Sequence, residues 1–105
     1  MQNEFGEKLD RNGYAPSIMQ PVDKCCYVCY GNMHTQRHEA LHGYNRQKSK
    51  EYGLWVNVCP TCHWKIHNTD GKLDRQLKQN AQHAAMTVYG WSEEDFRERL
   101  GKTYD

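Results

Sequence analysis

The sequence has few apolar residues and no long run of them. Only 37% of its 105 residues are apolar, and the mean hydropathy is -1.05. Residues 1–10 lack the apolar stretch of a signal peptide, and no later segment is long enough to cross a bilayer. We therefore expect no membrane partner and a cytoplasmic location, where cysteines stay reduced.

An excess of charge of one sign is also missing. The chain carries 14 basic and 13 acidic residues, a formal net charge of +1 and a pI of about 7.7. This balance gives no overall attraction to nucleic acid, so such binding must depend on a local cluster. The candidate is a basic segment with interleaved tyrosines, whose cations are Arg37, Arg46, Lys48 and Lys50. The alternative interpretation is a solvated loop without a ligand.

Internal repeats, low-complexity tracts and linkers are absent, which argues against several domains. We expect a single domain, 1–105, with an irregular N-terminal arm at 1–24, a core at 25–68 and two C-terminal helices at 69–105. A chain this short with so few apolar residues builds a small core. A bound metal would supply the stability that such a core lacks.

Apolar periodicity and turn residues predict the secondary structure. Leucine, alanine and valine recur at three- and four-residue steps after residue 72, which is typical of an amphipathic helix. Ser92 and Asp95 resemble a capping box, and Gly101 would end the helix that they begin. The expected elements are a short helix at 5–9, a strand at 54–58, a helix from His63, an amphipathic helix from 73 to about 90, and a last helix from 92 to 101.

Five cysteines are present, and four of them form two pairs with the same spacing. Cys26 and Cys29 make one Cys-x2-Cys knuckle, and Cys59 and Cys62 make the other. Two such knuckles complete a tetrahedron of thiolates, a closed arrangement that holds a structural zinc ion. Cys25 is then a spare structural thiol. The alternative is that Cys25, and not Cys26, pairs with Cys29 as a metal ligand. The alternative is a set of buried or disulfide-bonded cysteines.

Six histidines are present, and two of them follow the second knuckle directly. His63 and His67 are four residues apart, so on a helix their imidazoles lie on one face about one turn apart. His38, between the knuckles, is the candidate third ligand. Three neutral imidazoles suit zinc, manganese or nickel better than magnesium, and leave room for water and a phosphate oxygen. The alternative is surface histidines, as we expect for the remaining three: His34, His42 and His83.

This order of motifs resembles the HNH endonucleases. The similarity covers residues 26–68, where His38-Glu39 lies between the knuckles and His63-x3-His67 follows the second one. It implies an α+β fold with a small zinc-stapled ββα-metal core, in which a β-hairpin and a helix clasp one catalytic metal. Three further segments, at 10–18, 45–49 and 52–55, look like those of small uncharacterised HNH-like proteins of bacteriophages and prophages. If the chain is phage-encoded, the expected location is the cytoplasm of the host cell.

Carried onto this chain, the family's metal ligands would be His38, His63 and His67. Active members place a histidine base directly after the first ligand, where this chain has Glu39. A carboxylate is a weaker proton acceptor than an imidazole, so this departure bears directly on catalysis. The family's middle asparagine, which orients the base, has two candidates here, Asn45 and Asn57.

Glu39 leaves three interpretations open. It acts as a poorer base, it joins the metal shell while another histidine such as His42 or His34 acts, or the site is inactive. In a register shifted by one residue, His38 would be the base and Arg37 the ligand. That arrangement is chemically poor because a guanidinium cannot bind a cation.

The expected function is a metal-dependent endonuclease that hydrolyses phosphodiester bonds in DNA, with Zn2+ in the cysteine site and Zn2+, Mn2+, Ni2+ or Mg2+ in the histidine site. Basic side chains would hold the flanking phosphates with little regard to sequence. The alternative is a catalytically degenerate zinc module that binds DNA, or a phage or host protein, without cleavage. A third option is a structural zinc domain in which His63 and His67 only pack.

Overall fold

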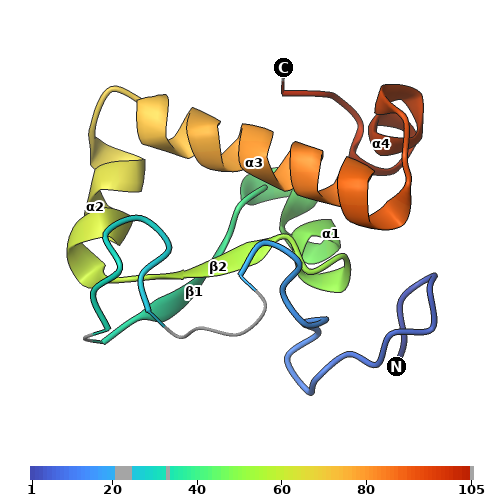
Figure 1. The fold of residues 1–105 in the computed structure, drawn as a ribbon, viewed down its shortest axis with the longest axis horizontal. Helices are drawn as coiled ribbons and strands as arrows, with labels where there is room; N and C mark the ends of the chain where they lie inside the picture. The colour runs from blue at the N-terminus through green and yellow to red at the C-terminus, as the bar shows by residue number, and fades with distance from the viewer. Residues whose placement is uncertain (21–24, 33, 105) are drawn as a thin grey trace.

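The computed structural model describes residues 1–20, 25–32 and 34–104, so the last four residues of the expected arm, 21–24, lie outside the described part. Within it the chain forms two antiparallel strands, four α-helices and one 3-10 turn, which confirms the expected α+β class (Figure 1). In this part of the chain no helix is both long and apolar enough to cross a membrane. In chain order the elements are β1 (Gln36–Glu39), η1 (Gly43–Asn45), α1 (Arg46–Glu51), β2 (Trp55–Val58), α2 (Pro60–Asn68), α3 (Lys72–Tyr89) and α4 (Glu93–Leu100).

The two strands pair with each other, and the second leads directly into a helix. β1 and β2 pair in antiparallel register, and β2 confirms the strand expected at 54–58. Cys59 is the N-cap of α2, because its thiol accepts the backbone N–H of Cys62 at 3.4 Å, and Pro60 fills the first turn. The helix therefore begins at Pro60, earlier than the expected start at His63.

Two apolar clusters fill the interior, and α3 contributes to both as it runs from α2 toward α4 (Figure 1). The first joins the C-terminal half of α3 to α4 and to the segments around α1. The second joins the N-terminal half of α3 to the sheet and α2, and it includes two buried cysteines. Leu77 in this cluster is 1% exposed, and burying such a side chain contributes about 2 kcal/mol. The cysteines are thus part of the apolar core.

The C-terminal helices begin and end where local sequence signals predict. α3 ends before Gly90, as expected. In the capping box of α4, the hydroxyl of Ser92 accepts the backbone N–H of Asp95 at 3.1 Å, and the carboxylate of Asp95 accepts the N–H of Ser92 at 3.0 Å. Gly101 follows the last residue of α4. Both expected helices are confirmed, because their ends depend on residues close in sequence.

The short helix expected at 5–9 is wrong. The side-chain oxygen of Asn3 accepts the backbone N–H groups of Phe5 and Glu7, each at 3.0 Å, so these groups bond to a side chain instead of a helical carbonyl. Gly6 has a φ of 77°, a left-handed conformation that a right-handed helix does not contain. Apolar spacing alone did not reveal this competition.

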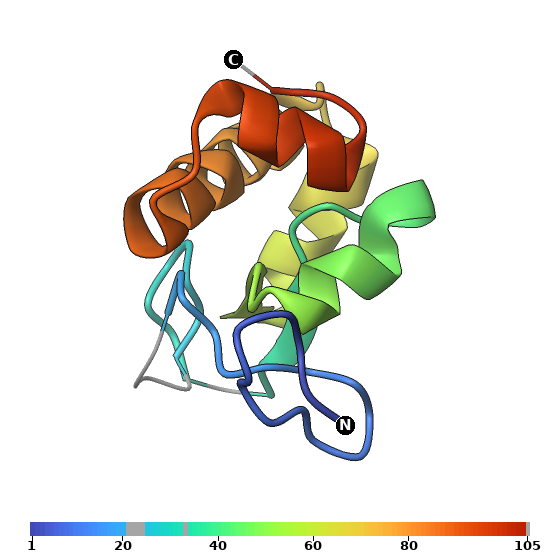
Figure 2. The same cartoon turned by 90° about the vertical axis from the view of Figure 1, so that its right-hand side faces the viewer.

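The N-terminal segment lies beside α1, as Figures 1 and 2 both show. The backbone N–H of Ala15 donates to the carbonyl of Lys50, and that of Ile18 donates to the carbonyl of Gly53, each at 2.9 Å. Gly53 has a φ of 70°, and a Cβ atom there would collide with the carbonyl of Pro16. This close backbone approach requires glycine and ties the segment to the turn before β2.

Candidate metal centres

The four knuckle cysteines lie together, although 30 residues separate Cys29 from Cys59. Their sulfur atoms all lie within 4.8 Å of one another, and the sulfurs of Cys29 and Cys59 are 3.7 Å apart. A zinc ion with Zn–S bonds of about 2.3 Å gives a tetrahedron with edges of about 3.8 Å. All four are free thiols, and Cys26 and Cys62 are buried. The cluster can therefore bind a metal such as zinc, and the disulfide alternative does not hold.

The surrounding hydrogen bonds prepare this cluster for ionisation. The backbone N–H of Cys29 points to the sulfur of Cys26 at 3.5 Å. Burial opposes ionisation of Cys26, but backbone hydrogen bonds from Cys29, Cys59 and Val28 outweigh it and lower the pKa of this thiol to about 6. Burial and hydrogen bonding to the other thiols raise the pKa of Cys62. A metal held by four thiolates would displace the remaining protons.

A second group of candidate ligands consists of three histidines from β1 and α2. One ring nitrogen from each of His38, His63 and His67 lies within 4.8 Å of the others. The ring centroids are 5.5 Å apart for His38 and His63, 5.5 Å for His38 and His67, and 4.9 Å for His63 and His67. Antiparallel pairing sets His38 opposite Val56 and so brings the strand residue to the helix.

His38 is the buried member of this group. It is 4% exposed, and its Nε2 atom has no hydrogen-bond partner among the described residues. Leaving such an atom without a partner costs about 1–3 kcal/mol, which a bound ligand would recover. Burial, followed by the charge of nearby His63, lowers the pKa of His38 to about 4, and burial also lowers the pKa of His67. Both rings are therefore mainly neutral at pH 7, the form that coordinates a metal.

The histidines border a cavity of about 400 Å3, a size common for small-ligand sites. Unlike four thiolates, three imidazole donors leave positions that water or a phosphate oxygen can take. The cavity is also lined by residues from β1, η1 and the start of α1: Gln36, Arg37, Glu39, His42, Gly43 and Arg46.

His42, expected on the surface, is instead half-buried in the wall of this cavity. Its Nε2 atom lies 2.8 Å from the Oδ1 atom of Asp74 on α3. Its ring centroid is 5.3 Å from that of His67 and 5.9 Å from that of His38. Burial opposes ionisation of Asp74, but hydrogen bonds from His42 and Lys78 outweigh it and lower the pKa of this carboxyl. An ionised carboxylate therefore holds the imidazole beside the three-histidine group.

Comparison with known proteins adds no precedent for this arrangement. No protein-family model, curated protein or solved structure matches the chain.

Glu39 is 7% exposed, and both of its carboxylate oxygens have partners. Oε1 accepts the Nε–H of Arg46 at 2.6 Å, and Oε2 accepts the hydroxyl of Tyr14 at 3.1 Å. Burial and the adjacent negative charge of Glu39 raise the pKa of Tyr14, so this hydroxyl keeps its proton. The carboxylate thus connects the N-terminal segment to α1 at the edge of the cavity.

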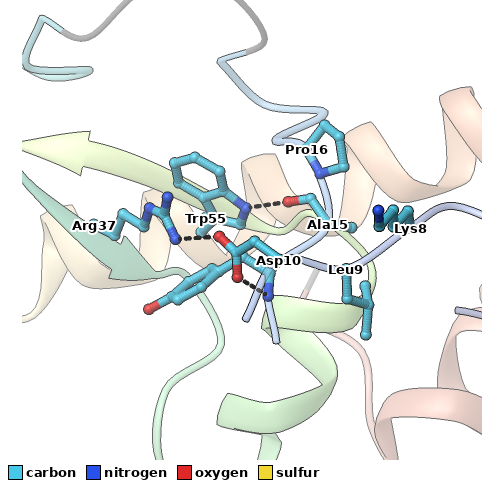
Figure 3. Close-up of a pocket in the computed structure, with 8 residues that line it drawn as sticks. Lys8, Leu9, Asp10, Ala15, Pro16, Arg37 and Trp55 are labelled. Carbon is cyan, nitrogen blue, oxygen red and sulfur yellow. Dashed lines mark hydrogen bonds and ion pairs between the residues drawn. The ribbon is translucent and has the colours of Figure 1, made fainter. Parts of the chain in front are cut away.

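Arg37 lines the histidine cavity and is also held from the other side (Figure 3). Its Nη1 atom donates to the carboxylate of Asp10 at 2.9 Å. Its guanidinium lies 4.4 Å from the ring centroid of Tyr14 and 5.0 Å from that of Trp55. These contacts fix the side chain and offset part of its charge.

The other three cations of the basic segment belong to α1 and not to a loop. Arg46 lines the cavity, and its side chain is 65% exposed even though it pairs with Glu39. Lys48 lies 3.9 Å from Glu51, and neither Lys48 nor Lys50 is among the described residues that line the cavity. The structure therefore brings two of the four predicted cations, Arg37 and Arg46, to the histidine group.

The remaining candidates lie away from the cavity. The side chain of Asn45 donates to the carbonyl of Leu100 at 2.8 Å, which anchors η1 to α4. Asn57 does not line the cavity within the described residues, and His34 and His83 are exposed as expected. The pair that sequence reasoning missed is His42 with Asp74, which 32 positions separate.

Proposed function

We propose that this protein is a metal-dependent endonuclease that hydrolyses phosphodiester bonds in DNA, with a ββα-metal core like that of the HNH endonucleases. The observation that carries the proposal is the unpartnered Nε2 atom of buried His38, beside two α2 histidines and a cavity of about 400 Å3. The chain order of β1, β2 and α2 agrees with such a core. In this proposal the four-cysteine cluster holds a structural zinc ion.

His38, His63 and His67 would hold the second divalent ion, and their imidazole donors favour zinc, manganese or nickel over magnesium. An ion held by these residues would supply a Lewis acid that polarises the scissile phosphate and stabilises the leaving oxygen. The three side chains come from a strand and a helix, so regular secondary structure fixes the positions of their backbones. This rigidity suits a site that must bind a metal without rearranging.

The proton of the attacking water needs an acceptor, and His42 is better placed for this role than Glu39. When the Nε2–H of His42 bonds to Asp74, the Nδ1 lone pair is available to accept a proton. The oxygens of Glu39, by contrast, already accept hydrogen bonds from Arg46 and Tyr14. Glu39 as the base stays a prediction, which the variants below test against His42.

Arg46 is the cation best placed to contact a phosphate, since its exposed guanidinium lies in the cavity wall. Both arginines pair with a carboxylate, but Arg37 would contribute less because its side chain is 39% exposed, against 65% for Arg46. Contacts of this kind bind the backbone without reading bases, so affinity would fall with added salt and specificity would be low.

A second candidate function is a non-catalytic zinc module that binds DNA, or a phage or host protein. The engaged carboxylate of Glu39, at the position where the HNH family has its base, favours this candidate. It shares the cysteine site and differs in requiring no chemistry at the histidines.

The test is nicking of supercoiled plasmid with magnesium, manganese, nickel or zinc added separately. The parent should nick, and His38→Ala and His42→Ala should not, whereas Glu39→Ala should retain activity if it remains folded. His83→Ala, which changes an exposed histidine on α3, is the matched control. If the folded parent fails to nick with any of the four metals, the non-catalytic module is favoured. If activity is lost only in Glu39→Ala, Glu39 is the base.

A further inference from the structure

Two exposed aromatic side chains flank the histidine cavity. Tyr44 is 100% exposed and lies on η1, directly after Gly43 and two residues before Arg46, both of which line the cavity. Trp64 is 60% exposed and lies on α2 between the cavity residues His63 and His67. A single exposed aromatic is ordinary. Here, however, the two elements that carry these rings, η1 and α2, both contribute lining residues to the same cavity.

The backbone under Tyr44 is firmly held although its ring is in solvent. The neighbouring Asn45 donates its side-chain amide to the carbonyl of Leu100 at 2.8 Å in the interior. Arg46 on the other side pairs with buried Glu39 at 2.6 Å. A fixed backbone with a free ring loses little conformational freedom when the ring meets a flat partner.

Trp64 is placed by helix geometry. Successive residues of an α-helix are about 100° apart, so Trp64 lies on the surface next to the His63 and His67 face. The next residue, Lys65, lies a further 100° around the helix and so faces away from the histidine pair. The α2 wall therefore has an exposed ring beside the histidines, and the η1 wall has Tyr44 near the cation Arg46.

We propose that Tyr44 and Trp64 stack against unpaired bases on either side of the phosphate that occupies the histidine cavity, so that the protein prefers single-stranded segments of nucleic acid. This inference deepens the proposed function and rests on its nucleic-acid substrate. Aromatic rings beside cations are the usual means of holding single strands, because every base has a flat face and every phosphate link a charge. Duplex bases are already stacked on each other and offer no face to such rings.

The experiment measures fluorescence anisotropy of a labelled single-stranded oligothymidine with phosphorothioate links, and of the duplex of the same length. Tyr44→Ala and Trp64→Ala should each weaken single-strand binding by about 5-fold to 150-fold, the range expected for one stacked base. Tyr44→Phe should bind like the parent because it keeps the ring. Tyr30→Ala is the matched control, since Tyr30 is 78% exposed but none of the described residues next to it lines the cavity.

Tryptophan fluorescence gives an independent readout. Stacking should quench the exposed Trp64, and the quenching should vanish in Trp64→Phe, because the other two tryptophans do not line the cavity. Trp91 is 7% exposed, and the indole of half-buried Trp55 donates to the carbonyl of Ala15. Unchanged affinity in both alanine variants, equal losses for duplex and single strand, or no single-strand binding by the parent would each overturn the inference. Plasmid nicking is scored separately. If single-strand binding depends on the two rings but no nicking occurs, only the proposed nuclease activity is rejected. If nicking occurs but binding does not depend on the rings, only the stacking role is rejected.

Discussion

The cysteine cluster and the histidine cluster share one helix but differ in what they leave open. α2 supplies Cys62 to the first cluster and His63 to the second, so adjacent residues face different sites. The cysteine group has four donors, two of them buried in the apolar core. The histidine group has three donors and borders a cavity. Four protein donors fill the coordination sphere of a zinc ion, as in structural sites. Three donors beside a cavity leave a position open for water or a substrate, as in catalytic sites.

Through the helix they share, the cysteine cluster should affect the histidine cluster more than the reverse. Cys59 caps α2, and Cys62 lies in its first turn, so a metal at the cysteines fixes the start of the helix that carries the histidines. The reverse dependence is weak, because His67 is exposed and lies in the last turn. Four experiments below sharpen or break this comparison.

The largest effect is expected for Cys62→Ser. Removing one of four thiolates should abolish zinc binding there, and the binding free energy of a structural zinc, about 10 kcal/mol or more, is folding free energy. The variant should lose helical circular dichroism and bind no metal at either cluster. Cys25→Ser is the matched control, since Cys25 is outside the four-sulfur group, and it should melt like the parent. A Cys62→Ser protein as stable as the parent would mean that the cysteines are not the staple.

His38→Ala should remove the second metal and leave the first. We expect elemental analysis to fall from two ions per chain to one, with zinc still bound by the cysteines. With zinc in the cysteine site only, the change in the free energy of unfolding should be about 2 kcal/mol or less, because the cavity created by the smaller side chain is offset by removing an unpartnered buried nitrogen. A parent that binds a single ion under saturating metal would contradict the second site. The variant would then differ from the parent only in stability.

How far the sequence predicted this arrangement follows from the range of each interaction. The knuckles, the His63 and His67 pair and the capping box of α4 are spaced within one helical turn, and local spacing predicts that they lie together. The meeting of the two knuckles needed only the rule that zinc takes four ligands. Cap and turn residues likewise predicted most helix ends.

The parts that failed depend on contacts between distant segments. His42 and Asp74 meet because α3 crosses near η1, and no periodicity links residues 32 positions apart. The bond between Tyr14 and Glu39 depends on how the N-terminal segment lies against α1, which apolar spacing does not encode. The short helix at 5–9 failed for a local reason, the competing hydrogen bonds of Asn3.

Asp74→Asn tests whether the proposed catalytic group, His42 beside the three histidines, includes Asp74 on α3. His42→Gln should lower the nicking rate by about 10²–10⁴-fold, the usual contribution of a base. Asp74→Asn should lower it by about 10-fold or more, with an unchanged KM and unchanged metal content, because an amide holds the imidazole less well than a carboxylate. In the His42→Gln background, Asp74→Asn should have little further effect.

Lys78→Ala is the control for that series, since Lys78 also pairs with Asp74, at 3.1 Å, but does not line the cavity. It should retain most of the activity. Fully additive losses in the double variant would show that His42 and Asp74 act separately, and the dyad would then be a packing contact.

Tyr14→Phe has the smallest expected effect. It tests whether Glu39 has a structural role, like the cysteine cluster, or a catalytic one, like the histidine cluster. The change removes one hydrogen bond to the carboxylate, so the free energy of unfolding should fall by about 1 kcal/mol in urea denaturation. Nicking should not change, because the bond serves the scaffold. Tyr44→Phe, which removes an exposed hydroxyl, should change neither quantity. If Tyr14→Phe instead lowered the nicking rate at unchanged stability, the tyrosine would be orienting a reacting carboxylate, and Glu39 would belong with the histidines.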